Sequence, residues 1–259
     1  MADFKTAKAG ELVVEIFEDR KELGKRSARL AADKINELLK EKEEIGIIFA
    51  AADSQHDFLV ELVQLDIPWT RIHAFHMDEY IGLSADSDKT FGRFLGERIF
   101  DLVPFKQVHL LNSTPEDLSA ECSRYSTLLD QYKPDLVFFG IGENTHLAFN
   151  DPHVAKFGDD AKVKVVHIDD RSRQQQVNEG CFSTIAEVPT MAFTLTIPSL
   201  LAANFGYCMV PGIRKAEAVF HTFYSEISEV YPSTILRTLP HARLFLDRDS
   251  ASRIEKVPT

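Results

Sequence analysis

The chain has 259 residues, of which 44% are hydrophobic and 27% charged, the composition of a globular protein that buries a large core without disulfides or structural metals. Its formal net charge of −11 argues against general nucleic-acid binding, which needs a basic surface. The three cysteines are odd in number and widely spaced, so they fit neither a disulfide framework nor a zinc site. Because no secretory signal and no apolar run of membrane-spanning length is visible, we expect a cytoplasmic protein without membrane partners.

Strand-like apolar runs alternate with helical repeats along the whole chain. Strands are predicted at 12–17, 45–51, 72–77, 136–140, 163–168, 190–197, 207–210 and 243–246. Helices are predicted at 19–42, 57–63, 90–101, 115–132, 215–224 and 233–239. This alternation indicates a single α/β domain over residues 1–259, with an open, mostly parallel sheet covered by helices on both faces.

The most informative segment follows the apolar run at 136–139 and extends from Gly140 to Pro152. Gly140 and Gly142 allow a sharp turn and a close approach of backbone to a ligand. His146 changes charge near neutral pH, and Asp151 is placed to orient it or to act beside it. Strand ends are where open parallel sheets bind small molecules. The alternative is a polar loop whose histidine only bonds to backbone.

Asp78 and Glu79 directly follow the predicted strand at 72–77. Because side chains alternate in an extended chain, these two should point apart, one facing a cleft as a base while the other anchors the loop. A surface turn accounts for the pair equally well. His73 lies on the opposite face from His76 and Asp78 if the strand is regular, so no metal site is predicted.

Two further segments carry groups suited to an anion. Ala52, Asp53 and Ser54 stand between a strand and a helix, where backbone N–H groups favour phosphate, although from these residues alone a simple helix cap is the stronger interpretation. A cationic set suited to gripping phosphate comes later in the chain, and the neighbouring glutamine amides at 174–176 are placed to line the pocket mouth. The cations are Arg171, Arg173, Arg214 and Lys215.

In chain order, these motifs resemble the glucosamine-6-phosphate deaminase (isomerase) family, which is related to the 6-phosphogluconolactonases. The resemblance spans nearly the whole chain and rests on four segments, 77–83, 108–112, 140–152 and 212–216. The lactonases carry Asp-Glu-Arg where this chain has Asp78-Glu79-Tyr80. The resemblance therefore favours amino-sugar phosphate chemistry over lactone hydrolysis, on a Rossmann-like fold of the sugar-phosphate isomerase type.

The resemblance implies conversion of an amino-sugar 6-phosphate to a ketose 6-phosphate and ammonia, without a cofactor. By that resemblance Asp78 is the base that moves a proton from C2 to C1, and His146, oriented by Asp151, promotes ring opening. Asn144 replaces an aspartate of the family, and it can orient groups but cannot titrate. The implied substrate-binding residues are Ala52, Asp53, Ser54, Glu79, Gly140, Gly142, Arg171 and Lys215.

Three alternatives stay open because the phosphate loop at 51–55 lacks the family's glycines. They are a galactosamine-6-phosphate isomerase, a 6-phosphogluconolactonase-like hydrolase and a non-catalytic sugar-phosphate sensor. Residues 154–164 do not match the basic allosteric region of hexameric relatives, so allosteric control is not expected. The expected partner is a small-molecule sugar phosphate, and a homo-oligomer is left open.

Overall fold

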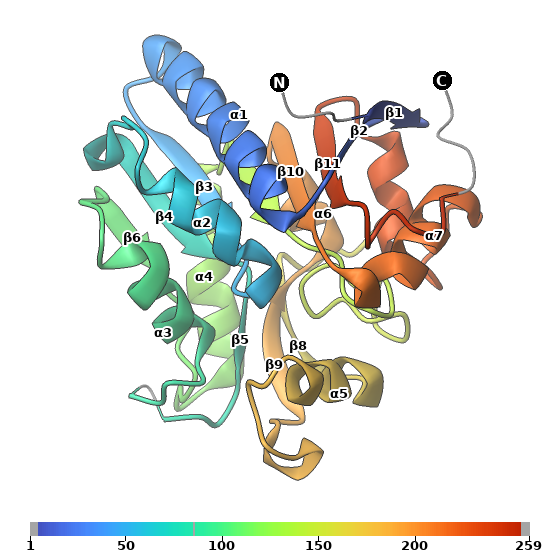
Figure 1. Ribbon diagram of the computed structural model, residues 1–259. Coiled ribbons are helices and arrows are strands. Elements are labelled where there is room, and N and C mark those ends of the chain that lie inside the picture. The colour runs from blue at the N-terminus through green and yellow to red at the C-terminus, as the bar shows by residue number, and fades with distance from the viewer. Residues whose placement is uncertain (1–4, 85, 255–259) are drawn as a thin grey trace.

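The computed structural model describes residues 5–84 and 86–254 (Figure 1). A sheet of eight strands runs in the order β1-β2-β11-β10-β7-β3-β4-β6. The strands are β1 Lys5–Ala9, β2 Leu12–Phe17, β3 Ile45–Phe49, β4 Ile72–His76, β6 Gln107–His109, β7 Leu136–Phe139, β10 Phe205–Val210 and β11 Ala242–Asp247. Only the β1–β2 pair is antiparallel, which confirms the predicted open, mostly parallel sheet.

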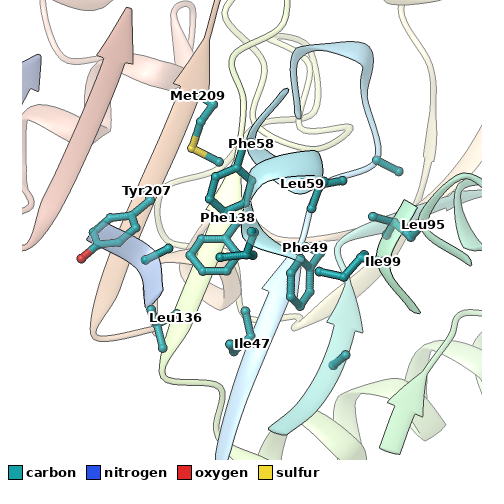
Figure 2. Close-up of a cluster of buried hydrophobic side chains, with 14 of the residues drawn as sticks. Ile47, Phe49, Phe58, Leu59, Leu95, Ile99, Leu136, Phe138, Tyr207 and Met209 are labelled. Carbon is teal, nitrogen blue, oxygen red and sulfur yellow. The ribbon is translucent and has the colours of Figure 1, made fainter. Parts of the chain in front are cut away.

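Helices cover the two faces of this sheet with separate apolar clusters. They are α1 Arg20–Glu41, α2 His56–Leu62, α3 Phe91–Leu95, α4 Leu118–Tyr132, α5 Asp170–Asn178, α6 Ile197–Leu201 and α7 Ala216–Tyr224. One cluster joins α1, α2 and α3 to the sheet, and the other joins α4, α6 and α7 to it. Figure 2 shows the first cluster around Phe138, whose ring lies 5.3 Å from that of Phe49 and 5.0 Å from that of Phe58. Within the described part of the chain no helix is both long and apolar enough to cross a bilayer.

A second, smaller sheet extends from the carboxyl end of the large one. Its antiparallel strands are β5 Asp78–Tyr80, β9 Met191–Leu195 and β8 Val163–His167. Only Met77 separates β5 from β4, so the chain passes directly from the large sheet into the small one. Figure 1 shows β8, β9 and α5 together at one end of the molecule.

Several predicted boundaries differ from the structure, and four elements were not predicted. The helix expected over 90–101 is α3 followed by a π-helical turn at Gly96–Phe100, and the helix expected over 233–239 is a 3₁₀-helix at Pro232–Thr238. The unpredicted elements of the described chain, apart from short turns, are β1, β6, α5 and α6, and β5 was expected as a loop. All of these except α5 have three to five residues, too few for a periodic pattern to be visible.

The strand order reverses between β3 and β7, which are neighbours in the sheet. From β3 the chain proceeds through β4 and β6 to one edge, and from β7 it proceeds through β10 and β11 toward the other. The loops that leave β3 and β7 therefore diverge and open a crevice at the carboxyl ends of these strands, where open α/β sheets bind ligands. The motif at 140–152 follows β7 and the segment at 50–55 follows β3, so both predicted site segments meet at this point.

Candidate active site

A small cavity of about 60 Å³ lies at the carboxyl ends of β3, β4 and β7. It is lined by seven of the residues that the sequence indicated, which come from four separate segments of the chain. These are Ala52, Ser54, Asp78, Gly140, Gly142, His146 and Lys215. Two amides that we expected at the pocket mouth, Gln175 and Gln176, also line it.

Asp78 and Glu79 point to opposite sides of β5, as the alternation of an extended chain predicts. Asp78 lines the small cavity, whereas the Glu79 carboxylate accepts hydrogen bonds from the backbone N–H groups of Tyr80, Phe91 and Gly92 at 2.8–3.0 Å. Glu79 thus anchors the start of α3. The structure places its carboxylate away from the small cavity, although the resemblance implied that it contacts substrate.

Both carboxyl groups are buried, and this alters their titration. Burial, together with the adjacent Glu79 carboxylate, raises the pKa of Asp78 well above its usual range. Burial also raises the pKa of Glu79 to about 7, against the opposing effect of its three N–H donors. No described residue donates a hydrogen bond to the Asp78 carboxylate. A poorly solvated carboxylate with a raised pKa is a strong proton acceptor for a bound substrate once it is ionised.

The small sheet holds Asp78 beside the loop that carries His146. Asp78 is paired in register with Thr194 of β9, and the Thr194 hydroxyl accepts a hydrogen bond from the Phe149 N–H at 3.0 Å. Asn150 adds a second link, because its side-chain amide donates to the Leu195 carbonyl at 2.8 Å. The pairing of β5 with β9 and these two side-chain hydrogen bonds therefore hold Asp78 and the loop of His146 in fixed relative positions.

The His146 ring is oriented through its Nδ1 atom. Nδ1 lies 2.7 Å from Asn144 Oδ1 and 3.1 Å from Asp151 Oδ1, and both of these atoms are acceptors. Nδ1 therefore carries the proton in the neutral ring, and Nε2 presents its lone pair. Nε2 makes no hydrogen bond within the described chain, so it is the ring nitrogen available to a ligand in the cavity.

Asp151 is a fully buried anion at the centre of this network. Its Oδ1 accepts from Asn144 Nδ2 at 2.9 Å and from the Ser172 hydroxyl, and its Oδ2 accepts from the Asp169 N–H at 2.9 Å. Burial opposes ionisation, but the contacts with His146, Ser172 and Asn144 outweigh it and lower the pKa of Asp151 to about 2. Asp151 therefore stays ionised at neutral pH and orients His146 instead of exchanging protons.

The glycines of the loop provide space for neighbouring side chains, and neither adopts a positive φ angle. A Cβ atom on Gly142 would lie 2.1–2.4 Å from three atoms of the His146 ring, and neither Gly142 nor Gly140 has a φ in the left-handed region. The positive φ angles of the loop belong instead to Thr145 at 71° and Ala148 at 50°. A β-branched residue at such an angle is strained, so tertiary contacts hold this loop in its shape.

The expected phosphate-binding residues divide between two places. Ser54 and Lys215 line the small cavity and also an outer cavity of about 450 Å³, which Asp53 and Arg214 line as well. Burial lowers the pKa of Lys215, whose Nζ lies 3.6 Å from Glu179 Oε1. Arg171 lines neither cavity and forms an ion pair with Glu217 at 3.0 Å, so the structure does not bring it to the site.

Helix α5 contributes two groups that were not identified in the sequence, Ser172 and, just beyond its end, Glu179. The Ser172 hydroxyl lies 2.9 Å from His146 Nδ1, and Glu179 accepts from Gln175 Nε2 at 2.7 Å while facing Lys215. Together with Gln175 and Gln176 they follow the spacing i, i+3, i+4, i+7, which places them on one face of a helix. A polar stripe at helical spacing was the available signal.

Two other observations bear on where the chemistry lies. A larger cavity, of about 530 Å³, is lined by Glu79 but by neither Asp78 nor His146, so its size does not make it the candidate active site. In the part of the chain that the structure describes, no group of three or more His, Cys, Asp or Glu side chains is arranged to hold a metal ion.

Comparisons with known proteins show the family to which this fold belongs. Residues 18–244 match the family described as glucosamine-6-phosphate isomerases/6-phosphogluconolactonase. A glucosamine-6-phosphate deaminase from an Exiguobacterium species is 34% identical over 225 residues, 87% of each chain. The structure of a monomeric glucosamine-6-phosphate deaminase superposes with a TM-score of 0.85 at 29% identity, covering 92% of this chain and 98% of the other. A 6-phosphogluconolactonase from Thermotoga maritima, with a TM-score of 0.74 at 20% identity over 90% of this chain and 98% of its own, shares the fold.

Proposed function

This chain belongs to the family of glucosamine-6-phosphate isomerases and 6-phosphogluconolactonases, and from that membership we propose that it is an enzyme that converts an amino-sugar 6-phosphate to a ketose 6-phosphate and ammonia. The observation that carries the proposal is the pairing, in one cavity, of an unbonded buried carboxylate at Asp78 with a ring nitrogen at His146 that is free to accept a proton. The names of the similar proteins favour glucosamine 6-phosphate as the substrate.

Ring opening comes first and is assigned to His146. With Nδ1–H held by Asn144 and Asp151, Nε2 accepts the proton of the O1 hydroxyl. It returns this proton to the ring oxygen of the sugar as the bond between C1 and that ring oxygen breaks. The imidazole gains no net proton in this exchange. Asp151 remains an anion throughout and stabilises the transient imidazolium.

Asp78 then carries the isomerisation. Its carboxylate removes the proton from C2 of the open-chain aldose, while the ammonium nitrogen of the substrate gives up one proton and the carbonyl oxygen O1 gains one, which leaves an enolamine. The protonated Asp78 then returns the C2 proton to C1. The product is a 2-iminium ketose, and addition of one water releases ammonia in its protonated form and leaves the ketose. No described residue donates a hydrogen bond to this carboxylate, and burial raises its pKa. Both effects make it a better base for removing a proton from carbon.

The proposal is tested by following ammonia and fructose 6-phosphate released from glucosamine 6-phosphate. Asp78→Asn should reduce turnover by several orders of magnitude, because the amide cannot accept a proton from carbon. The matched control is Asp130→Asn, the same chemical change at a largely exposed carboxylate paired with Lys162, which should behave as wild type. Turnover by Asp78→Asn near the wild-type rate would refute the assignment of the base.

A panel of related substrates separates the remaining functions. Galactosamine 6-phosphate tests the configuration at C4, and 6-phosphogluconolactone tests hydrolysis on the same fold. Rapid lactone hydrolysis without deamination would replace the proposal by a lactonase. Tight binding of the sugar phosphates without turnover of any would indicate a sensor.

A further inference from the structure

The small cavity cannot contain the whole substrate of the proposed reaction. Its volume of about 60 Å³ accommodates roughly four to six water molecules at 10–15 Å³ each, far fewer atoms than a hexosamine phosphate has. The outer cavity adjoins it, because Ser54 and Lys215 line both. With C1 and C2 held between Asp78 and His146, the phosphate end has to extend past Ser54 into the outer cavity.

The outer cavity contains a cation that no resemblance assigned to the site. Arg20, the first residue of α1, lines it together with Arg214 and Lys215. Arg214 is engaged by the Asn178 carbonyl at 2.6 Å, and Lys215 faces Glu179 at 3.6 Å. Arg20 differs from both, because it is tied to the very loop that follows β3 and carries Ser54.

From this arrangement we propose that Arg20 binds the phosphate of the substrate and determines the preference for a phosphorylated sugar, and that Asp53 is the counter-ion which the phosphate displaces. The inference rests on the proposed function for the identity of the substrate. It assigns to Arg20 the charge that Arg171, paired with Glu217 outside both cavities, does not supply.

One edge of the Arg20 guanidinium is held by Asp57, and the contacts of its other edge with Asp53 can be replaced by a ligand. Nε donates to Asp57 of α2 at 2.5 Å, while Nη1 and Nη2 donate to the Asp53 carboxylate at 3.2 Å and the Asp53 carbonyl at 3.0 Å. The Arg20 and Asp53 side chains are 40% and 59% exposed, and an exposed ion pair is weak. A phosphate dianion matches the two Nη donors in a bidentate manner and with greater charge.

The charge of the outer cavity explains why one more cation is needed there. Its lining includes six carboxylates against three cations; the carboxylates are Glu18, Asp19, Asp53, Glu179, Asp247 and Asp249. Most are already bonded: Asp19 caps α1, Asp247 accepts from the Gly212 N–H, and Glu18 pairs with Arg248. Asp53 is the carboxylate that shares its cation with the entering phosphate, so a sugar without phosphate gains nothing from Arg20.

Inorganic phosphate is the probe, measured with the full-length protein by calorimetry and by competition against the amino-sugar phosphate. Arg20→Gln should raise the dissociation constant of phosphate and the KM of substrate at least tenfold, with kcat within about twofold of wild type. Asp53→Asn should lower both constants, and the double variant should fall between the two single variants. Arg29→Gln, an exposed arginine on the same helix with no such contacts, is the matched control.

The outcomes are distinct for this inference and for the proposed function. Arg20-dependent phosphate binding without turnover of any amino-sugar phosphate would remove the function and leave the phosphate site. Wild-type deamination with unchanged phosphate affinity in Arg20→Gln would overturn the role of Arg20, and weaker binding in Asp53→Asn would overturn that of Asp53. Arg20→Lys guards against misfolding, since it keeps the charge but not the paired donors, and should retain an intermediate affinity.

Discussion

The glycine beneath the His146 ring offers the sharpest test of the active-site geometry. A Cβ atom at position 142 would lie 2.1 Å from Cε1, 2.2 Å from Nε2 and 2.4 Å from Nδ1 of His146. Carbon atoms in contact stay about 3.5–4.0 Å apart, so Gly142→Ala has to move the ring by roughly 1.5 Å. Nδ1 now lies 2.7 Å from Asn144 Oδ1, and a shift of that size breaks the contact.

Misplacing a reacting group by about 1 Å costs on the order of 10²-fold in rate. Gly142→Ala should therefore lower kcat for deamination at least about 100-fold, or about 2.7 kcal/mol of transition-state stabilisation. Gly142 has no positive φ, so alanine imposes no backbone strain there. The folded state should lose only the 1–3 kcal/mol typical of overpacking, measured by urea unfolding.

Two other glycine-to-alanine changes calibrate the result. At Gly140 a Cβ would meet Ser54 Oγ at 3.1 Å and Gln55 Nε2 at 3.2 Å, so Gly140→Ala should alter KM more than kcat. At Gly158 a Cβ meets nothing within 4 Å, and no change is expected. Wild-type kcat in a folded Gly142→Ala protein would refute the view that the ring position at His146 controls the reaction.

Three further predictions concern the carboxylates and the hydroxyl of the site. The raised pKa of Asp78 means that its protonated form favours folding, and this contribution to stability is lost as pH rises through the folded-state pKa. The Tm of Asp78→Asn should therefore rise progressively relative to the wild-type Tm from pH 4 to 9. A Tm difference that stays constant over this range would count against the raised pKa. The depressed pKa of Asp151, about 2 against 3.8, contributes about 2–3 kcal/mol above pH 4 that is lost as pH falls toward 2. The stability deficit of Asp151→Asn in urea should therefore stay constant between pH 8 and 5, and a deficit that fades in that range would contradict it. Ser172→Ala should lower kcat about tenfold with KM nearly unchanged, as expected for loss of one hydrogen bond of about 1.4 kcal/mol to a charged group; an effect confined to KM would place Ser172 in substrate binding.

The sheet and the approximate positions of the candidate catalytic side chains were predictable because they depend on local patterns. Buried parallel strands are continuous apolar runs, and the residues after them gather at one sheet edge whatever the details of the helices. Asp78 and His146 lie at that edge. Helix α5 was not predictable in the same way, because its site-facing residues are polar and hydrophobic periodicity is absent. Ser172 and Glu179 were missed with it.

Tertiary structure determines why a glycine is needed at a position and which residue pairs with a cation. The sequence shows that Gly142 lacks a side chain, but only the structure shows that the His146 ring fills that space. Similarly, the sequence leaves Arg171 available for phosphate, whereas in the structure it is paired with Glu217. Arg20 lies 33 residues from Asp53 in the chain, and no local pattern connects the two.

Asn144, which by the resemblance stands in place of an aspartate, is consistent with the ring-opening role proposed for His146. Asn144 accepts from His146 Nδ1 through Oδ1 and donates to Asp151 through Nδ2 at 2.9 Å, so one amide orients both neighbours. A carboxylate at position 144 would have no proton to donate and would stand against the buried Asp151 anion, which would raise the pKa of one of them. Asparagine leaves a single negative charge beside the ring. In the proposed ring opening only Nε2 therefore exchanges protons, while Asp151 and Asn144 hold the ring in one tautomer.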